Sequence, residues 1–132
     1  MENQQENEYR PLILVAEDDD SNFKLIKAII GKKCDILWAK NGEEIINLFR
    51  ENQEKAVAIL MDIKMPVMNG LDATMVIRTE NNQIPIIMQT AYAFSSDRDN
   101  AMKCGASEVL VKPITLFILR DCLKRYLPEL NW

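Results

Sequence analysis

Residues 56–70, with the sequence AVAILMDIKMPVMNG, lead from a continuous apolar run through an acidic residue to a turn. The apolar run has no polar alternation, which is typical of a strand that is buried on both faces. Asp62 follows the run directly, and Asn69-Gly70 marks the beginning of another element. The stretch therefore predicts a central strand of a parallel sheet with a carboxylate at its carboxyl end.

The rest of the chain repeats this arrangement. Further runs rich in Val, Ile and Leu occupy residues 12–16, 84–88 and 109–111, and a weaker run at 36–39 predicts one more strand. Between the runs the apolar residues follow a helical period. The predicted stripes are Leu25, Ile26, Ile29 and Ile30; Ile45, Ile46, Leu48 and Phe49; Ala73, Val76 and Ile77; and Leu116, Leu119, Leu123 and Tyr126. The polar residues 95–103 predict an additional short helix.

This alternation of strands and helices predicts a single α/β domain, a doubly wound (βα)5 sandwich of three layers with right-handed crossovers. We expect residues 11–128 to form the domain, with 1–10 as a flexible lead-in or linker and 129–132 as a C-terminal tail. In such folds ligands bind where the strands end, at the carboxyl edge of the sheet.

The composition excludes several classes of protein. The chain has 132 residues, 48% hydrophobic and 27% charged, with a net charge of −4, which suits one globular domain. No basic stripe favours nucleic acid, and no apolar run approaches the roughly 18 residues of a membrane span. The N-terminus lacks the pattern of a signal peptide. We therefore expect a cytoplasmic protein that binds neither nucleic acid nor a membrane directly.

The cysteine and histidine content narrows the possible chemistry. Cys34, Cys104 and Cys122 are far apart and form no CxxC motif, which favours reduced thiols over a disulfide framework or a zinc site. The chain contains no histidine. Histidine-based triads, histidine metal ligands and a phosphohistidine on this chain are therefore excluded.

Polar residues follow four of the predicted strands: Glu17-Asp18, Asp62, Thr90 and Lys112. Carboxylates that meet at one sheet edge repel each other, by about 4 kcal/mol at ~4 Å and an effective dielectric of ~20. A set of carboxylate oxygens suits Mg²⁺, and a carboxylate can act as a nucleophile that forms an aspartyl phosphate. Lys112 and Thr90 would contact the phosphoryl oxygens.

Each of these residues also has an ordinary structural explanation. An acidic run is often a solvated loop or a helix N-terminus, and Asp62 alone could be a turn residue. Thr90 could cap a helix, and Lys112 could lie on the surface. The joint placement of all of them at strand ends favours a functional site.

Four segments are similar to the receiver domain of response regulators, over roughly residues 12–127. They are LILVAEDDDSNFKLI (12–26), AILMDIKMPVMNGLDA (58–73), IPIIMQTAYA (84–93) and GASEVLVKPI (105–114). The Asp-x-x-Met-Pro-x-Met-x-Gly motif that begins at Asp62 is specific to this family, as is its combination with an upstream Glu-Asp pair and a downstream Lys-Pro. The resemblance implies a flavodoxin-like fold with strand order 2-1-3-4-5 and a cis peptide bond at Lys112-Pro113.

The resemblance also implies a role for each site residue. Asp62 would be the phospho-acceptor, and Thr90, Lys112 and the backbone of Ala91 would contact the phosphoryl group. A Mg²⁺ or Mn²⁺ ion would be held by Asp18, Asp62, the backbone carbonyl of Lys64 and, through water, Glu17. Lys64 and Tyr92 would tune the rate of self-dephosphorylation.

The implied function is signal transduction in a phosphorelay. A phosphohistidine of a histidine kinase or phosphotransfer domain would donate the phosphoryl group, which switches an interaction surface and is slowly lost by self-dephosphorylation. The chain would not be a turnover enzyme. It would be either a stand-alone regulator or the receiver of a hybrid sensor histidine kinase, and its polar lead-in favours the latter.

Two other classes of protein share parts of this pattern. A Mg²⁺-dependent phosphohydrolase of the haloacid dehalogenase type usually has a second Asp where Lys64 stands. A receiver-like interaction module that is never phosphorylated is disfavoured because every charged residue of the site is present.

The sequence departs from the family pattern at three positions. Val109 replaces the usual Tyr or Phe three residues before the lysine, so a switch that couples Thr90 to an aromatic rotamer cannot operate in that form. Asp19 replaces a frequent Asn and could attract the metal or face solvent, and we favour solvent.

The third departure is at Phe117 in the last helix. If Leu116, Leu119 and Leu123 face the sheet, Phe117 points outward. It would then either pack on a neighbouring loop or anchor a partner domain or second copy through the last strand and helix.

Overall fold

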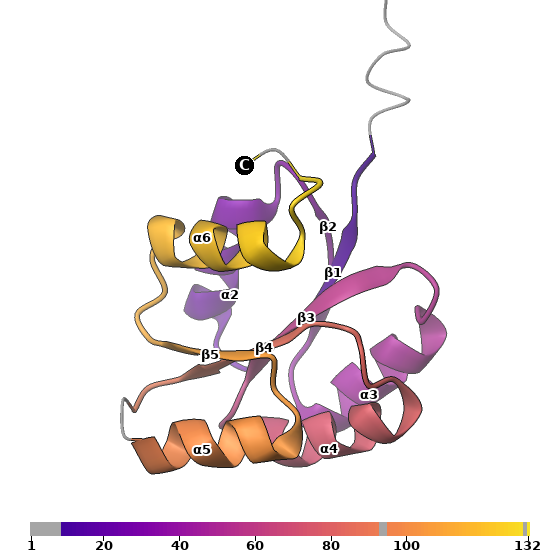
Figure 1. Cartoon of the computed structure of the whole chain (residues 1–132), viewed down its shortest axis with the longest axis vertical. Helices are drawn as coiled ribbons and strands as arrows, with labels where there is room; N and C mark the ends of the chain where they lie inside the picture. Colours follow the sequence, from indigo (N-terminus) through magenta and orange to yellow (C-terminus); the bar gives the residue numbers. More distant parts are fainter. Residues whose placement is uncertain (1–8, 93–94, 131) are drawn as a thin grey trace, which may run out of the picture.

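The computed structural model describes residues 9–92, 95–130 and 132. Five parallel strands form one sheet in the order β2-β1-β3-β4-β5, with helices on both faces (Figure 1). The elements in chain order are β1 (Leu12–Ala16), α2 (Asp20–Ile30), β2 (Asp35–Ala39), α3 (Gly42–Glu51), β3 (Ala56–Asp62), α4 (Gly70–Glu80), β4 (Ile86–Thr90), α5 (Ser95–Cys104), β5 (Glu108–Val111) and α6 (Leu116–Tyr126). The predicted fold class and strand order are confirmed.

The fourth strand lies two residues later than the apolar run at 84–88 predicted. Pro85 has no N–H group to donate to a neighbouring strand, so the paired residues begin at Ile86. The carbonyl of Pro85 still accepts a hydrogen bond from the Ile59 N–H at 2.9 Å. This shift makes Thr90 the last residue of β4.

Alternate residues of the central strands face opposite layers of the sandwich. Residues such as Val15, Leu60 and Ile87 pack in a buried cluster with α2 and α6. Their neighbours Ala16, Met61 and Met88 pack with residues of α3 and α4 on the other face. Because the strands are buried on both sides, only their ends can present polar groups to water.

In two helices one residue of the predicted apolar stripe lies outside the buried face. Leu116 is 37% exposed and Leu25 is 42% exposed, so the expectation that both face the core is wrong. In α6, Cys122 joins Leu119 and Leu123 on the buried side. Leu116 is the first residue of α6, in a turn where Leu116, Phe117 and Ile118 are all exposed. Leu25 lies about 100° around the helix from the buried Ile26.

The helix starts depend on short polar side chains. Asp19, Asn41, Asn69 and Thr115 each accept a hydrogen bond from the backbone N–H three residues further on. At Asn69-Gly70 the backbone also makes a close approach, because a Cβ atom on Gly70 would lie 2.1 Å from the carbonyl oxygen of Asp62. The first turn of α4 therefore rests against the end of β3.

The described residues at both ends of the chain contact the domain. Residues 1–8 of the predicted lead-in lie outside the described residues, but the guanidinium of Arg10 donates to Asp35 and to the carbonyls of Gly31, Lys32 and Cys34. At the other end, within the predicted tail, Leu130 is buried in the core cluster between the sheet and the helices α2 and α6. Trp132 packs against this cluster, and residue 131 lies outside the described residues. Arg10 therefore contacts the segment between α2 and β2.

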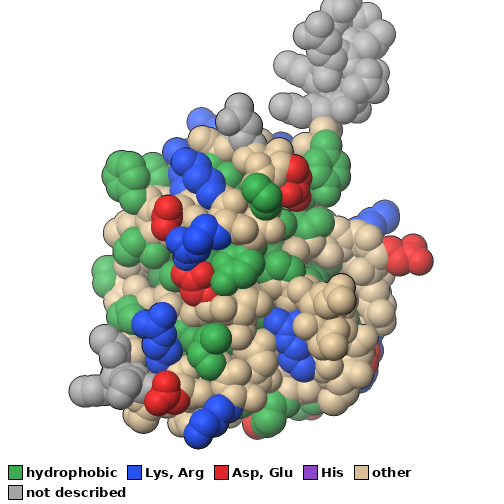
Figure 2. Space-filling view, in the orientation of Figure 1, with side chains coloured by type: hydrophobic (Ala, Val, Ile, Leu, Met, Phe, Trp, Pro, Cys, Tyr) green, Lys and Arg blue, Asp and Glu red, His purple; other side chains and the backbone are tan. Residues whose placement is uncertain are grey.

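Among the described residues, no helix is both long and apolar enough to cross a membrane. Basic, acidic and hydrophobic side chains are interspersed on the face shown in Figure 2. All three cysteines are unpaired, and Cys34 and Cys122 are buried.

Candidate functional site

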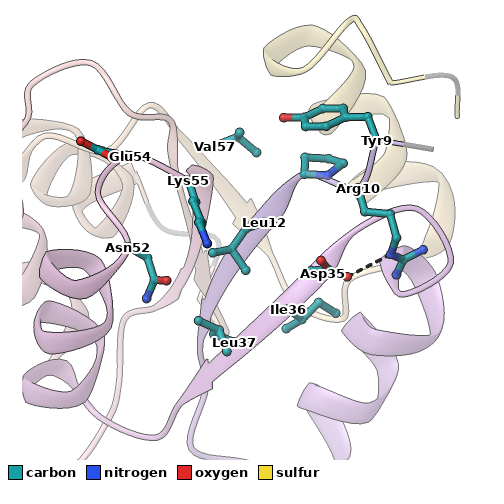
Figure 3. A pocket seen from close by; sticks show the side chains of 11 residues that line it. Tyr9, Arg10, Leu12, Asp35, Ile36, Leu37, Asn52, Glu54, Lys55 and Val57 are labelled. Atoms are coloured by element: carbon teal, nitrogen blue, oxygen red, sulfur yellow. Dashed lines mark hydrogen bonds and ion pairs between the residues drawn. The ribbon is translucent and has the colours of Figure 1, made fainter. Parts of the chain in front are cut away.

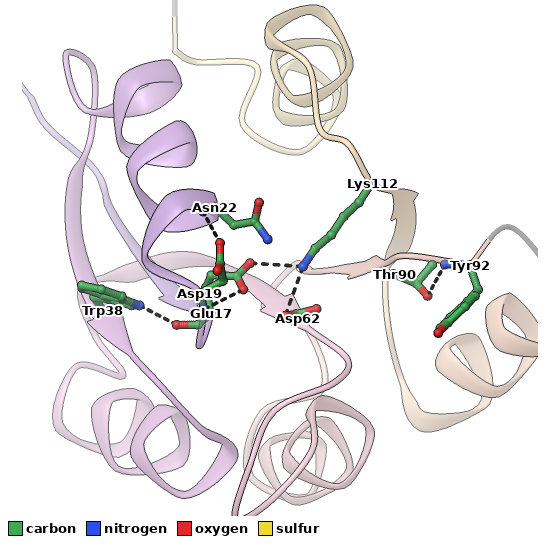
Figure 4. Close-up of polar contacts among 8 residues, drawn as sticks. All are labelled: Glu17, Asp19, Asn22, Trp38, Asp62, Thr90, Tyr92 and Lys112. Carbon is green, nitrogen blue, oxygen red and sulfur yellow. Dashed lines mark hydrogen bonds and ion pairs between the residues drawn. The ribbon is translucent and has the colours of Figure 1, made fainter.

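Glu17, Asp62 and Lys112 point to the same side of the sheet. Each stands two residues beyond a strand residue in the core cluster under α2 and α6, namely Val15, Leu60 and Leu110. Because side chains two apart along a strand share a face, the apolar rows of this layer continue into charged groups at the carboxyl edge. The predicted convergence of strand ends is present in the structure (Figure 4).

Three carboxylates form a compact cluster at this edge. Glu17, Asp18 and Asp62 each offer an oxygen, and these oxygens lie within 4.8 Å of one another. Glu17 is fully buried, Asp62 is nearly so and Asp18 is exposed. The Lys112 Nζ lies 3.4 Å from Glu17 Oε1 and 3.2 Å from Asp62 Oδ2. One ammonium group thus pairs with two buried carboxylates.

The charges and hydrogen bonds of the cluster are compatible with the binding of a cation. Burial and the neighbouring Asp62 carboxylate raise the pKa of Glu17 to about 7. Burial opposes the charge of Lys112, but Asp62 and Glu17 outweigh it, so that the pKa of Lys112 is raised above its ordinary value. Among the described residues no donor is hydrogen-bonded to the buried Glu17 Oε1. Carboxylate oxygens with an unsatisfied acceptor fit a hard divalent ion such as Mg²⁺.

A second group of predicted residues lies at the end of β4 and on the loops after β3 and β4. Thr90 Oγ1 accepts a hydrogen bond from the Tyr92 N–H at 3.1 Å. The Lys64 Nζ lies 3.4 Å from the Tyr92 hydroxyl and 4.5 Å from the centroid of its ring. Lys64 and Tyr92 therefore contact each other. The resemblance implies one role for both, the tuning of self-dephosphorylation.

The loop between Asp62 and α4 is held in a strained conformation. Val67 has a φ of +69°, which a β-branched residue rarely adopts, and the Met68 N–H donates to the Pro66 carbonyl across it. The Gly70 N–H donates to Ile63 at 2.8 Å, and the Gly42 N–H of α3 donates to Met68 at 2.9 Å. Contacts from two helices thus fix the segment that follows Asp62.

The remaining predicted residues take different places. Asp19 is exposed as expected, and its side chain caps α2. Val109 is buried in β5 beside Met88, on the opposite face from Lys112. Ala91 is exposed at the end of β4.

Phe117 is 80% exposed, so the alternative in which it packs on a neighbouring loop is wrong. The buried side of α6 is defined by Leu119, Cys122 and Leu123, and Phe117 falls on the other side of the helix.

Trp38 is a neighbour of the site that the sequence did not reveal. Its indole Nε1 donates to the carbonyl oxygen of Glu17 at 2.7 Å. The weak apolar run at 36–39 predicted a strand but gave no sign that this side chain reaches the end of β1. A tryptophan on a partly exposed strand beside the acidic strand end is the only signal that could have indicated it.

A hollow on the surface lies away from this site. It is lined by residues that include Tyr9, Arg10, Leu12, Leu37 and Lys55, between the first described residues and the strands β2 and β3 (Figure 3). These residues flank the amino ends of the strands, so the hollow is separate from the carboxylate cluster.

Comparison with known proteins identifies the family. The profile of the response regulator receiver domain matches residues 13–124. The chain is 38% identical to hybrid signal transduction histidine kinase I of Dictyostelium discoideum, over 84% of this chain and 7% of that protein. It is 30% identical to the polar-differentiation response regulator DivK of Brucella anthropi, over 89% of this chain and 96% of that protein.

Solved structures agree with these relatives. The receiver domain of a sensor histidine kinase of Pseudomonas aeruginosa, which has a magnesium ion in its active site cleft, is 30% identical with a TM-score of 0.80; the match covers 89% of this chain and 98% of that chain. A structure of the Saccharomyces cerevisiae phosphotransfer protein Ypd1 with the receiver domain of the response regulator Ssk1 gives 26% identity and a TM-score of 0.82, covering 89% of this chain and 88% of that chain.

The fold and the site define a phosphorylatable signalling domain, and the chain belongs to the response regulator receiver domain family. It acts in phosphorelay signal transduction through phosphorylation of an aspartate. It spans less than a tenth of the length of the Dictyostelium hybrid kinases that it matches, 7% of one and 4% of another.

The raised pKa of Glu17 predicts a pH dependence of stability in the metal-free protein. A pKa that folding raises from 4.5 to about 7 stabilises the folded state at low pH, and this contribution is lost as the pH rises through the folded-state value. We expect the free energy of unfolding to lose up to roughly 3 kcal/mol between about pH 4.5 and about pH 8 from this group. Guanidinium unfolding at several pH values measures the loss, which Glu17→Gln should remove; equal pH slopes for both proteins would contradict it.

Proposed function

We propose that Asp62 is the phospho-acceptor of this receiver domain and that the reaction requires Mg²⁺ or Mn²⁺. The observation that carries this proposal is the cluster of Glu17, Asp18 and Asp62 oxygens within 4.8 Å, with Lys112 3.2 Å from Asp62. We further propose that residues 11–128 form a cytoplasmic domain and that a phosphohistidine on another protein or domain is the donor.

The chemistry follows from the placement of these groups. A carboxylate oxygen of Asp62 attacks the phosphorus, the bond from phosphorus to the histidine nitrogen breaks, and the imidazole leaves with the electron pair. Asp18, Asp62, the Lys64 carbonyl and, through water, Glu17 would hold the ion, which neutralises charge on the phosphoryl group when bound. Lys112, already beside Asp62, pairs with a phosphoryl oxygen, while the Thr90 hydroxyl and the Ala91 backbone meet the others.

The lifetime of the acyl phosphate would depend on Lys64 and Tyr92. Their side chains contact each other and lie on the two loops that flank the acceptor, after β3 and β4. A ring held there by a cation shields the acyl phosphate from the water that hydrolyses it.

The phosphohistidine donor would be a histidine kinase or a phosphotransfer domain. The yeast relative was solved with a histidine phosphotransfer protein, and the Dictyostelium relatives are hybrid histidine kinases. We therefore propose that this chain receives its phosphoryl group from such a domain and that it is the receiver of a hybrid kinase. Phe117, with the exposed Leu116, Ile118 and Val111, would contact a partner domain beside the site.

Phosphorylation of Asp62 can be tested directly. Incubation with acetyl phosphate and Mg²⁺ should add one phosphoryl group to the intact mass, and chelation of the metal should prevent it. Asp62→Asn should abolish the adduct, because an amide is not a nucleophile of this kind. Asp72→Asn, a matched change at an exposed acid of α4, should leave it unchanged. An adduct on the Asp62→Asn protein would refute the assignment.

Removal of the Tyr92 ring should shorten the lifetime of the phosphorylated state. Loss of a cation–π contact of about 0.5–1 kcal/mol corresponds to about two- to fivefold faster hydrolysis in Tyr92→Ala. Tyr92→Phe keeps the ring and should remain close to the wild type. The decay of the phosphorylated mass after removal of acetyl phosphate measures both rates, and an unchanged rate in Tyr92→Ala would exclude the shielding role.

A charge at Phe117 should separate partner recognition from phosphorylation chemistry. With phosphorylated Ypd1 as a probe donor, Phe117→Asp should slow transfer at least about fivefold, the effect of losing about 1 kcal/mol at an interface anchor. Labelling by acetyl phosphate should not change. Met75→Asp, a similar change at an exposed residue of α4, is the control. Equal transfer rates for the wild type and Phe117→Asp would exclude this surface as the docking site of the probe.

A further inference from the structure

Trp38 joins three parts of the structure beside the carboxylate cluster. It lies in β2, its ring stacks on Phe23 of α2 with centroids 3.9 Å apart and planes 2° apart, and its Nε1 reaches Glu17. The Lys40 Nζ lies 4.8 Å from the Trp38 ring centroid and 3.7 Å from Asp20 Oδ1. The ring is therefore packed against α2 and cannot turn freely.

The backbone of Glu17 is held by β2 through both of its polar groups. Its N–H donates to the Ala39 carbonyl at 2.9 Å, and its C=O accepts from the Trp38 indole at 2.7 Å. Because a peptide unit is planar, fixing the Glu17 carbonyl also fixes the N–H of Asp18 and the direction in which that residue leaves the strand. The first of these bonds is part of normal strand pairing, whereas the second depends on one side chain.

The segment from Glu17 to Asp19 is held at both of its ends. Glu17 Oε2 also accepts a hydrogen bond from the Asp19 N–H at 3.2 Å, and Asp19 in turn caps α2. The turn from β1 into α2 is thus held at Glu17 by Trp38 and at Asp19 by the helix. Asp18 lies between them, exposed and within reach of Asp62.

We propose that Trp38 is a positioning residue of the metal site. Its indole N–H holds the Glu17 carbonyl, and the rigid 17–18 peptide orients both carboxylates toward Asp62 before the ion binds. The inference rests on the metal site proposed above. Groups that orient metal ligands contribute to affinity without touching the ion, because they reduce the reorganisation that binding requires.

The test compares two identical substitutions with different contacts. Trp38→Phe keeps an aromatic ring for Phe23 but removes the N–H. Trp132→Phe removes the only other tryptophan, whose Nε1 has no hydrogen-bond partner among the described residues. Isothermal titration calorimetry with Mg²⁺ should give a Kd about three- to tenfold higher for Trp38→Phe than for the wild type, and an unchanged Kd for Trp132→Phe.

Two further measurements distinguish positioning from a general loss of stability. The rate of phosphorylation by acetyl phosphate should require more Mg²⁺ in Trp38→Phe but reach the wild-type rate at saturation. In Trp132→Phe, where Trp38 is the only indole, Mg²⁺ should change the fluorescence emission, and in Trp38→Phe it should not.

The outcomes separate this inference from the proposed function. If the wild type and both variants bind no Mg²⁺, the proposed metal site is refuted. If the wild type binds Mg²⁺ and Trp38→Phe binds it equally well, the metal site stands and the role of Trp38 is refuted. A lower unfolding midpoint with an unchanged Kd also refutes it, because that result describes a residue that serves packing alone.

Discussion

The repulsion between two buried carboxylates is the constraint on which the rest of this domain depends. Glu17 follows β1 and Asp62 ends β3 on the same side of the sheet, and each lies in contact range of one ammonium group, that of Lys112. Buried like charges are tolerated only where counter-charges stand close to them. The sheet meets this condition because β3 lies between β1 and β4, with β5 next to β4, so that the ends of three strands supply the acids and the lysine.

The loop after Asp62 is held in place by contacts from two helices. A residue in the left-handed region such as Val67 costs of order 1–3 kcal/mol and persists only when the surroundings impose it. Here Gly70 and Gly42 allow two helix starts to approach this segment closely, and both donate backbone hydrogen bonds to it. Backbone contacts to Asp62, Ile63 and Met68 therefore hold the segment that carries the Asp62 carboxylate.

The fold and most of the site could be predicted because they depend on local order in the sequence. An apolar run followed at once by a charged residue marks a strand end, and parallel strands bring such ends together, as for Asp62 and Lys112. Contacts that depend on register or helix rotation could not be predicted. Trp38 meets Glu17 only because β1 and β2 pair in one particular register. Leu116 is exposed and Cys122 is buried because one side of α6 faces the sheet, and the spacing of the apolar residues alone does not decide which side that is.

Arg10 and the C-terminal residues define where the polypeptide enters and leaves the domain. Arg10 binds the carbonyls that follow α2, and Tyr126 near the end of α6 donates to the Ser107 carbonyl just before β5. Both attachments are at the amino ends of the strands, and in Figure 1 the first described residues and the C-terminus both lie toward the top of the view. Sequence added before or after the domain would therefore extend from the edge opposite Asp62. This geometry makes the domain a cassette: it can be joined to unrelated neighbours in a fusion without covering its reactive edge.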